Sequence, residues 1–70
     1  MTLLNLANSI KERRKVLNIT QKQLSELAEI GLRTLINIES GNGNPTILVI
    51  NKLAIVLGME LKFEVKKHGF

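Results

Sequence analysis

The sequence predicts a mainly α-helical domain of four to five helices, followed by a C-terminal β-strand that pairs across a homodimer. Three observations lead to this fold class. Within residues 20–41, two short segments with apolar residues at helical spacing lie back to back. Residues 47–57 (ILVINKLAIVL) are apolar and lie between a threonine and a glycine, which can begin and end a helix. Residues 60–66 alternate polar and apolar side chains, the period of a half-buried strand.

Residues 3–17 are expected to form the first helix. Leu6, Ile10 and Leu17 share one side of it. Arg14 falls on or beside this apolar stripe, where a cation is costly unless it meets an anion. Asn18 can end the helix, because asparagine tolerates the left-handed conformation.

Residues 21–40 are typical of a helix-turn-helix motif. Thr20 and Gln23 predict a capping box at the start of its first helix. Glu29, Ile30 and Gly31 interrupt the pattern between the two helices, and a glycine at 41 can end the second. The residues expected to face the core are Leu24, Leu27, Ala28, Leu35 and Ile38. Such a motif places its second helix where it can enter the major groove of DNA.

The turn at residues 42–45 and a Thr46 cap lead into the expected helix at 47–57. One stripe of this helix should face the core: Ile47, Ile50, Ala54 and Leu57. The apolar residues left over are Leu48, Val49, Ile55 and Val56. We expect some of them to line a subunit interface. The alternative, packing on the first helix and on the C-terminal segment, stays open.

The C-terminal segment 60–66 is interpreted as a dimerisation strand. Its apolar side chains are Leu61, Phe63 and Val65. The sequence offers no second strand, so the same strand of another copy is the expected mate. An antiparallel pair would bring Glu60 and Glu64 near Lys66 and Lys62 of the partner subunit. An extended segment lying on the 47–57 helix is the alternative, and residues 67–70 are expected to fray.

Composition limits the function classes. The net charge of +4 suits a polyanionic partner, and residues 11–22 concentrate it. A merely solvated basic face would explain that cluster as well. The chain has no cysteine, no aspartate and one histidine, and no phosphate-binding glycine loop is present. We therefore expect no enzymatic activity, no cofactor and no metal site. No run of 18 apolar residues occurs, so no membrane association is expected, and the location is expected to be cytoplasmic.

Several short pieces between residues 10 and 61 resemble, in order and spacing, the lambda-repressor-like (Cro/C1-type, XRE) helix-turn-helix proteins. These pieces are Leu17-Asn18-Ile19-Thr20-Gln21, Leu24, Ala28, Ile30, Ile38-Glu39-Ser40-Gly41, Asn44-Pro45-Thr46, Leu53-Ala54 and Leu57-Gly58. The resemblance implies a four-to-five-helix lambda-repressor-like DNA-binding domain over 10–61. It also implies that Arg14 pairs with Glu39, which would explain a cation beside the apolar stripe.

The sequence departs from that family at four positions. Glu29 stands where the family usually has a glycine, and Gly31 stands where a serine or threonine often caps the helix. Leu32 and Ile36 occupy positions that are often polar or small. These departures change positions that would recognise bases and leave the fold unaffected.

A narrower likeness is to the HipB-type antitoxins. The Arg13-Arg14-Lys15 run, the Leu27-Ala28 end of the first motif helix and the segment 61–65 (LKFEV) carry it. It implies a homodimer closed by an intersubunit β-ribbon, an autorepressor of a toxin–antitoxin operon and a HipA-like kinase toxin as partner. A free-standing phage or chromosomal repressor is one alternative, and a protein-interaction module without DNA binding is another.

In a helix-turn-helix, the N-terminal part of the second helix meets the base edges and the first helix crosses the DNA backbone. The residues expected to face the groove are Gly31, Leu32, Arg33, Thr34 and Asn37. Candidates for backbone contact are Gln21, Lys22, Ser40 and Asn42. Ser40 can equally serve only to end its helix, and Asn37 can reach either adenine or only phosphate. A dimer would set two such helices about 34 Å apart, on a palindromic operator.

Overall fold

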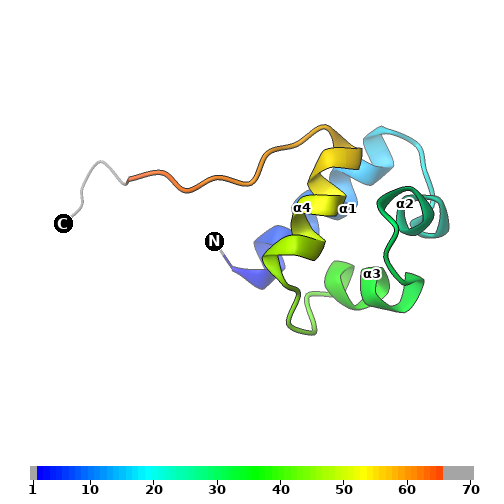
Figure 1. Ribbon diagram of the computed structural model, residues 1–70, viewed down its shortest axis with the longest axis horizontal. Helices are drawn as coiled ribbons and strands as arrows, with labels where there is room; N and C mark the ends of the chain where they lie inside the picture. The colour runs from blue at the N-terminus through cyan, green and yellow to red at the C-terminus, as the bar shows by residue number, and fades with distance from the viewer. Residues whose placement is uncertain (1, 66–70) are drawn as a thin grey trace.

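The structure is a computed structural model and describes residues 2–65. It contains four helices, α1 (Leu3–Val16), α2 (Gln21–Ala28), α3 (Leu32–Glu39) and α4 (Ile47–Leu57). They gather into one helical body, and the chain after α4 leads away from it (Figure 1). The expectation of a mainly helical domain of four to five helices is therefore confirmed for the described residues, which contain four.

The helices begin at the signals that the sequence contains. Thr20 accepts a hydrogen bond from the backbone N–H of Gln23, whose side chain accepts one from the N–H of Thr20. Thr46 accepts from the N–H of Val49 at the start of α4. Gly31 precedes α3 without a side-chain cap. Three of the four helix starts, counting Thr2 before α1, thus have a threonine that satisfies a free N–H group.

Two non-glycine residues have the left-handed backbone conformation, Asn18 with φ 59° and Glu29 with φ 57°. Asn18 follows α1, as expected. Glu29 ends α2 and turns the chain toward α3, so the glycine usual at this place in the family is replaced by a residue that is strained there. Both turns orient α2 between its two neighbours.

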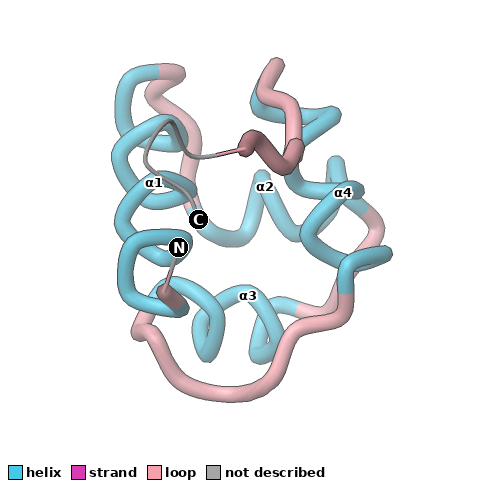
Figure 2. The backbone as a smooth tube through the Cα atoms, turned by 90° about the vertical axis from the view of Figure 1, so that its left-hand side faces the viewer, coloured by secondary structure: helices cyan, strands magenta, loops and turns pink. Residues whose placement is uncertain are grey.

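The core is aliphatic and lies between all four helices, which Figure 2 shows surrounding it. α1 and α2 each pack against both α3 and α4. The side chains in the buried cluster are Ile10, Leu24, Ala28, Leu35, Ile38, Ile50, Leu53 and Leu57. Burial of this many leucine and isoleucine side chains is the main stabilising term for the domain.

Three core assignments were wrong. Leu17 is 39% exposed because α1 ends one residue earlier and Leu17 is its C-cap. Leu27 is 61% exposed, since the buried face of α2 is shifted toward Ser25, whose hydroxyl donates to the carbonyl of Lys22. Ile47 is 69% exposed because it is the first residue of α4, and the buried face of that helix begins only at Ile50.

Fully buried Leu53 completes the inward stripe of α4 in place of Ile47. The observed stripe of Ile50, Leu53, Ala54 and Leu57 has the spacing of one helical face. The prediction failed because α4 is apolar nearly all round, so that several stripes fit the sequence equally well.

The strand expected at 60–66 does not form in the single chain. Residues 2–65 contain no β-strand. Residues 60–65 begin against the core at Leu61 and then run away from the helical body (Figure 1). A strand needs a second strand to complete its hydrogen bonds, and this chain supplies none in its described part. Pairing with a second copy therefore remains a prediction, and residues 66–70 lie outside the described residues.

Residues 2–65 contain no helix long and apolar enough to cross a bilayer. Within the same range, no three histidine, aspartate or glutamate side chains gather in a way that could hold a metal ion.

Candidate nucleic-acid interface

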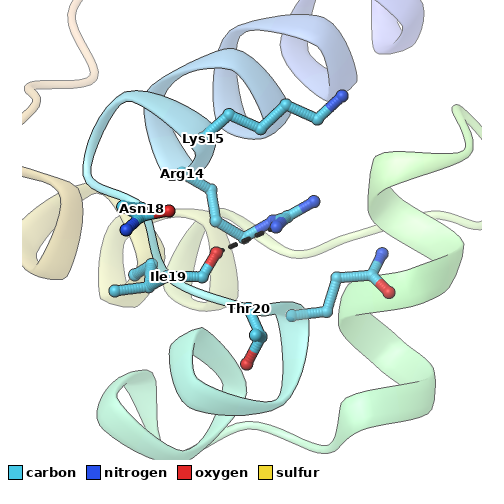
Figure 3. A pocket seen from close by; sticks show the side chains of 6 residues that line it. Arg14, Lys15, Asn18, Ile19 and Thr20 are labelled. Carbon is cyan, nitrogen blue, oxygen red and sulfur yellow. Dashed lines mark hydrogen bonds between the residues drawn. The ribbon is translucent and has the colours of Figure 1, made fainter.

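A bidentate ion pair joins the first helix to the end of the third. Arg14 Nε donates to Glu39 Oε2 at 2.8 Å, and Arg14 Nη2 donates to Glu39 Oε1 at 3.0 Å. The remaining guanidinium nitrogen, Nη1, donates to the carbonyl of Ile19 at 3.0 Å (Figure 3). Glu39 is 3% exposed and the Arg14 side chain 13%. The pair that the resemblance implied is therefore present in the structure, and it also holds the loop ahead of α2.

The hydrogen bond from Arg14 to Glu39 raises the pKa of Arg14, and the charge of Glu39 raises it further against the opposing effect of burial. Arginine is protonated in proteins at any ordinary pH, so this pair is permanently charged on the Arg14 side. Arg14 therefore places a permanent positive charge against the buried Glu39 side chain.

Gln21, the first residue of α2, is tied to the same carboxylate. Its Nε2 donates to Glu39 Oε1 at 3.1 Å. Gln21 was expected to contact phosphate through its amide, and the structure instead gives that amide a partner inside the protein. The backbone N–H groups of Gln21 and Lys22 make no hydrogen bond within the described residues. These N–H groups are free to bind an anion, as at other helix N-termini.

The entrance to α2 is a shallow hollow with basic walls. Arg14, Lys15, Asn18, Ile19, Thr20 and Gln21 line it. Figure 3 shows Lys15 and Arg14 projecting from α1 on the side opposite Thr20. An adjoining hollow runs on between Lys11 and Ser40. The surface around the N-terminus of α2 thus carries positive charge from α1, which adds to the positive end of the α2 dipole.

The two faces of α3 have opposite roles. Leu35, Ile38 and Glu39 are buried against the rest of the domain. All the residues expected to face a DNA groove are exposed, namely Gly31, Leu32, Arg33, Thr34 and Asn37. Two apolar side chains lie on the outside of the helix, since Leu32 is 40% exposed and Ile36 is 42% exposed. The structure therefore brings the groove-facing candidates together on one surface.

The end of α3 and the loop after it contribute two further candidates, Ser40 and Asn42. Both side chains are exposed. Asn42 also lines a small hollow together with Thr34 and Asn37 of α3. The Ser40 hydroxyl donates to the carbonyl of Asn37 at 2.8 Å, which favours the alternative in which Ser40 serves to end its helix. A polar edge thus continues from α3 into the loop.

Arg13 has a structural contact that the sequence did not reveal. Its Nε donates to the carbonyl of Leu57 at 2.8 Å, at the C-terminal end of α4. The sequence placed Arg13 only in the basic cluster 11–22 and in the Arg13-Arg14-Lys15 run. The two residues lie 44 positions apart in the sequence, so no local pattern could have indicated the contact. Arg13 satisfies a carbonyl that the end of a helix leaves free.

The residues expected at a subunit interface divide into two groups. Leu48 is 67% exposed, Ile55 71%, Phe63 95% and Val65 96%. Val49, Val56 and Leu61 are partly buried against the core, which is the intramolecular packing left open above. Only the first group offers extensive apolar area for a partner.

A model of the helix-turn-helix family matches residues 10–63. The chain belongs to the helix-turn-helix family. This helix-turn-helix chain is also 35% identical, over 51 residues, to an uncharacterised HTH-type transcriptional regulator of Methanothermobacter thermautotrophicus. The match covers 73% of this chain and 74% of that relative. The resemblance is confirmed at the level of the helix-turn-helix family.

Proposed function

We propose that this chain is a sequence-specific DNA-binding transcriptional repressor that acts as a homodimer on a palindromic operator. One observation supports this most directly: α3 presents Arg33 and its neighbours to solvent while its opposite face is fixed in the core. The far end of α3 is also held, through Glu39, to α1 and α2. A rigidly held helix with an exposed polar face is what base recognition in the major groove requires.

Base recognition is assigned to the start of α3. Arg33 can donate two parallel hydrogen bonds to guanine O6 and N7, a contact that contributes roughly 1–3 kcal/mol of discrimination. Leu32 or the methyl group of Thr34 can pack on the methyl group of thymine. Because Leu32 and Ile36 are apolar, the site that we expect includes thymines beside the guanine.

Backbone contact is assigned to the entrance of α2. The free N–H groups of Gln21 and Lys22 can hold a phosphate. Lys11 and Lys15 line the adjoining hollows, and Lys22 adds its own charge from the first turn of α2. Neutralised phosphates release counterions, so the binding constant should fall as salt is added. With these few cations per subunit we expect a moderate salt slope.

The narrower proposal is a HipB-like antitoxin that represses its own toxin–antitoxin operon and binds a HipA-like kinase. The resemblance of the Arg13-Arg14-Lys15 run and of residues 61–65 supports it. Leu48 and Ile55 supply exposed apolar surface for a protein partner. An adjacent reading frame for a HipA-like kinase whose product co-purifies with this chain is the expected result. If no such reading frame is adjacent, the antitoxin proposal is wrong and the free-standing repressor is the function that we propose.

The test of the main proposal is a fluorescence anisotropy titration of the purified chain. One probe is the DNA upstream of its own coding frame and the other is a shuffled DNA of the same composition. We expect tighter binding to the upstream DNA, by at least about a thousandfold for a specific regulator. Equal affinity for both probes contradicts sequence-specific recognition. If the chain binds neither probe at low salt, DNA binding is excluded and the protein-interaction module is the function that fits.

A further inference from the structure

Asn42 and Gly43 form an asparagine–glycine pair in the loop between α3 and α4. Among the asparagines of the chain, Asn42 alone is followed by a glycine. Both residues are exposed, and Figure 1 shows the loop projecting from the helical body. The side chain of Asn42 makes no hydrogen bond within residues 2–65, and the backbone N–H of Gly43 donates none. The groups that can react with each other in such a pair are therefore unoccupied.

An asparagine can react with the backbone nitrogen of the residue that follows it. The nitrogen of Gly43, after losing its proton, bonds to Cγ of Asn42, and the side-chain nitrogen leaves as ammonia. The product is a five-membered cyclic imide. Water then opens the ring at either of its two carbonyls, which leaves aspartate or isoaspartate at position 42. The two steps together hydrolyse one amide and need water as the only co-reactant.

The residue after the asparagine decides how easily the ring closes. Gly43 has no side chain to obstruct the attack, and glycine is the residue with the freest backbone. Its φ of 82° already lies where other residues are strained. Asn44, two positions further on, is the opposite case. The nitrogen of Pro45 carries no proton, so Asn44 cannot form the neutral imide.

The remaining asparagines are hindered in other ways. Four of them lie inside helices: Asn5, Asn8, Asn37 and Asn51. The N–H that would have to attack belongs there to the hydrogen-bond ladder of the helix. Asn18 follows α1, but the N–H of Ile19 donates to the carbonyl of Arg14 at 3.3 Å, and isoleucine is branched at Cβ. Within the described residues, position 42 is therefore where the reaction meets least obstruction.

The reactive pair lies on the surface that we assign to DNA. Asn42 and Gly43 line one hollow together with Thr34 and Asn37, two of the groove-facing candidates on α3. A carboxylate at position 42 would stand among groups that approach the DNA, whose phosphates are negatively charged. It also lowers the net charge of the chain, +4 by sequence, by one. The reaction therefore opposes the electrostatic attraction on which DNA binding depends.

We propose that Asn42 is a site of spontaneous deamidation through attack by the backbone nitrogen of Gly43, and that the negative charge so created weakens DNA binding. The chain thereby loses affinity for DNA slowly and irreversibly, at a rate that its own sequence sets. The effect on DNA binding rests on the proposed function, whereas the reaction itself does not.

Ageing of the purified chain tests the reaction. After several days in warm, mildly alkaline buffer, mass spectrometry of proteolytic peptides should show replacement of an amide by a carboxylic acid at position 42. Isoaspartate should be detected in the same peptide by enzymatic methylation, because only the cyclic imide leads to it. The yield should rise with pH, since the nitrogen of Gly43 attacks after losing its proton. Absence of isoaspartate at position 42, or equal conversion at other asparagines, overturns the proposal.

Two variants are matched controls for the reaction. Asn42→Gln keeps a neutral amide at the same place but would have to close a six-membered ring, so it should stay unmodified under the same conditions. Asn44→Gln changes the neighbouring asparagine in the same loop and should leave the conversion of Asn42 at the wild-type rate. Conversion at position 42 that is as fast in Asn42→Gln as in wild type contradicts the cyclic imide.

The effect on DNA is measured by fluorescence anisotropy after ion exchange has separated modified from unmodified chains. Binding to the upstream DNA should weaken roughly fivefold for each modified subunit, the effect of one unit charge close to a phosphate in water. The difference should narrow as salt is added. Asn42→Gln should bind equally well before and after ageing. Equal affinities of the modified and unmodified wild-type chains overturn the proposed effect.

Asn42→Asp separates the charge from damage to the fold. Its circular dichroism spectrum should match that of wild type, because the Asn42 side chain makes no hydrogen bond within residues 2–65. It should nevertheless bind the upstream DNA more weakly than Asn42→Gln. An Asn42→Asp chain that is folded and binds as tightly as Asn42→Gln contradicts the role of the charge.

The proposed function and this inference can fail separately. A freshly purified chain that ignores upstream DNA contradicts the repressor, while isoaspartate at position 42 would still support the reaction. A chain that binds its upstream DNA specifically and shows no isoaspartate after ageing overturns this inference and leaves the DNA-binding assignment intact.

Discussion

Replacing Arg14 by alanine should strongly destabilise the domain, because the substitution breaks the buried ion pair with Glu39. The substitution removes two hydrogen bonds to Glu39, of 2.8 and 3.0 Å, and one to the carbonyl of Ile19. Glu39 would keep only its bond from Gln21, at a place where its side chain is 3% exposed with Arg14 present. Breaking a buried pair in this way costs roughly 3–5 kcal/mol.

That cost is comparable with the whole stability expected of so small a core, which rarely exceeds roughly 3–5 kcal/mol. In a domain of this size 1 kcal/mol shifts the melting temperature by roughly 4–8 °C. Arg14→Ala should therefore melt at least roughly 12 °C below wild type or be unfolded at 25 °C. Circular dichroism at 222 nm during heating and during urea titration measures both quantities.

Two control variants separate loss of the pair from loss of an arginine. Arg33→Ala removes an exposed arginine and should leave the melting temperature within a few degrees of wild type. Arg14→Met combined with Glu39→Leu replaces both partners by apolar residues and should recover most of the loss, because no unpaired charge stays buried. Overlaid melting curves for wild type and Arg14→Ala would refute the reasoning.

The effect of pH follows from the direction of the Arg14 shift. Glu39 raises the pKa of Arg14, so the stability contributed by Arg14 is fully present below its unfolded-state pKa and is lost only as the pH rises through the folded-state value. Both values lie far above neutral pH. The difference between wild type and Arg14→Ala should accordingly stay constant from pH 7 to pH 9.

Four further variants test individual contacts. Arg33→Ala should relax specificity at one base pair per half-site, by roughly 1–3 kcal/mol in anisotropy titrations of operator variants. Lys22→Ala should weaken operator and random DNA alike and lower the salt slope by about 1 per subunit. Arg13→Ala removes the bond to the Leu57 carbonyl and should cost roughly 1.5–3 kcal/mol in urea unfolding. Glu29→Gly should stabilise the domain by about 1 kcal/mol, because glycine adopts a φ of 57° without strain.

The sequence was most informative where a local rule determines the structure. Thr20 with Gln23 indicated a capping box, and Asn18 indicated a left-handed helix end; both depend on neighbours within three residues. The two-helix pattern of residues 21–40 likewise follows from periodicity over a few turns. These local features are present in the structure because the conformation that each short segment prefers is also the one that the tertiary fold requires.

The sequence was least informative where several faces or distant partners compete. In α4 nearly every residue is apolar, so the choice of Leu53 over Ile47 depends on where α1 and α2 lie. The exposure of Leu27 has the same origin. Arg13 reaches the end of α4, and Gln21 reaches Glu39, only after the helices have packed. Contacts between elements need a tertiary arrangement that periodicity does not supply.

Hydroxyl-radical footprinting of the wild-type chain on its own upstream DNA tests whether two copies of α3 read a palindromic site. We expect two protected half-sites with centres one helical turn apart, related by a two-fold axis, and protection that weakens as salt is raised. Uniform protection along the DNA, or protection that does not change with salt, would show that α3 does not recognise bases in this way.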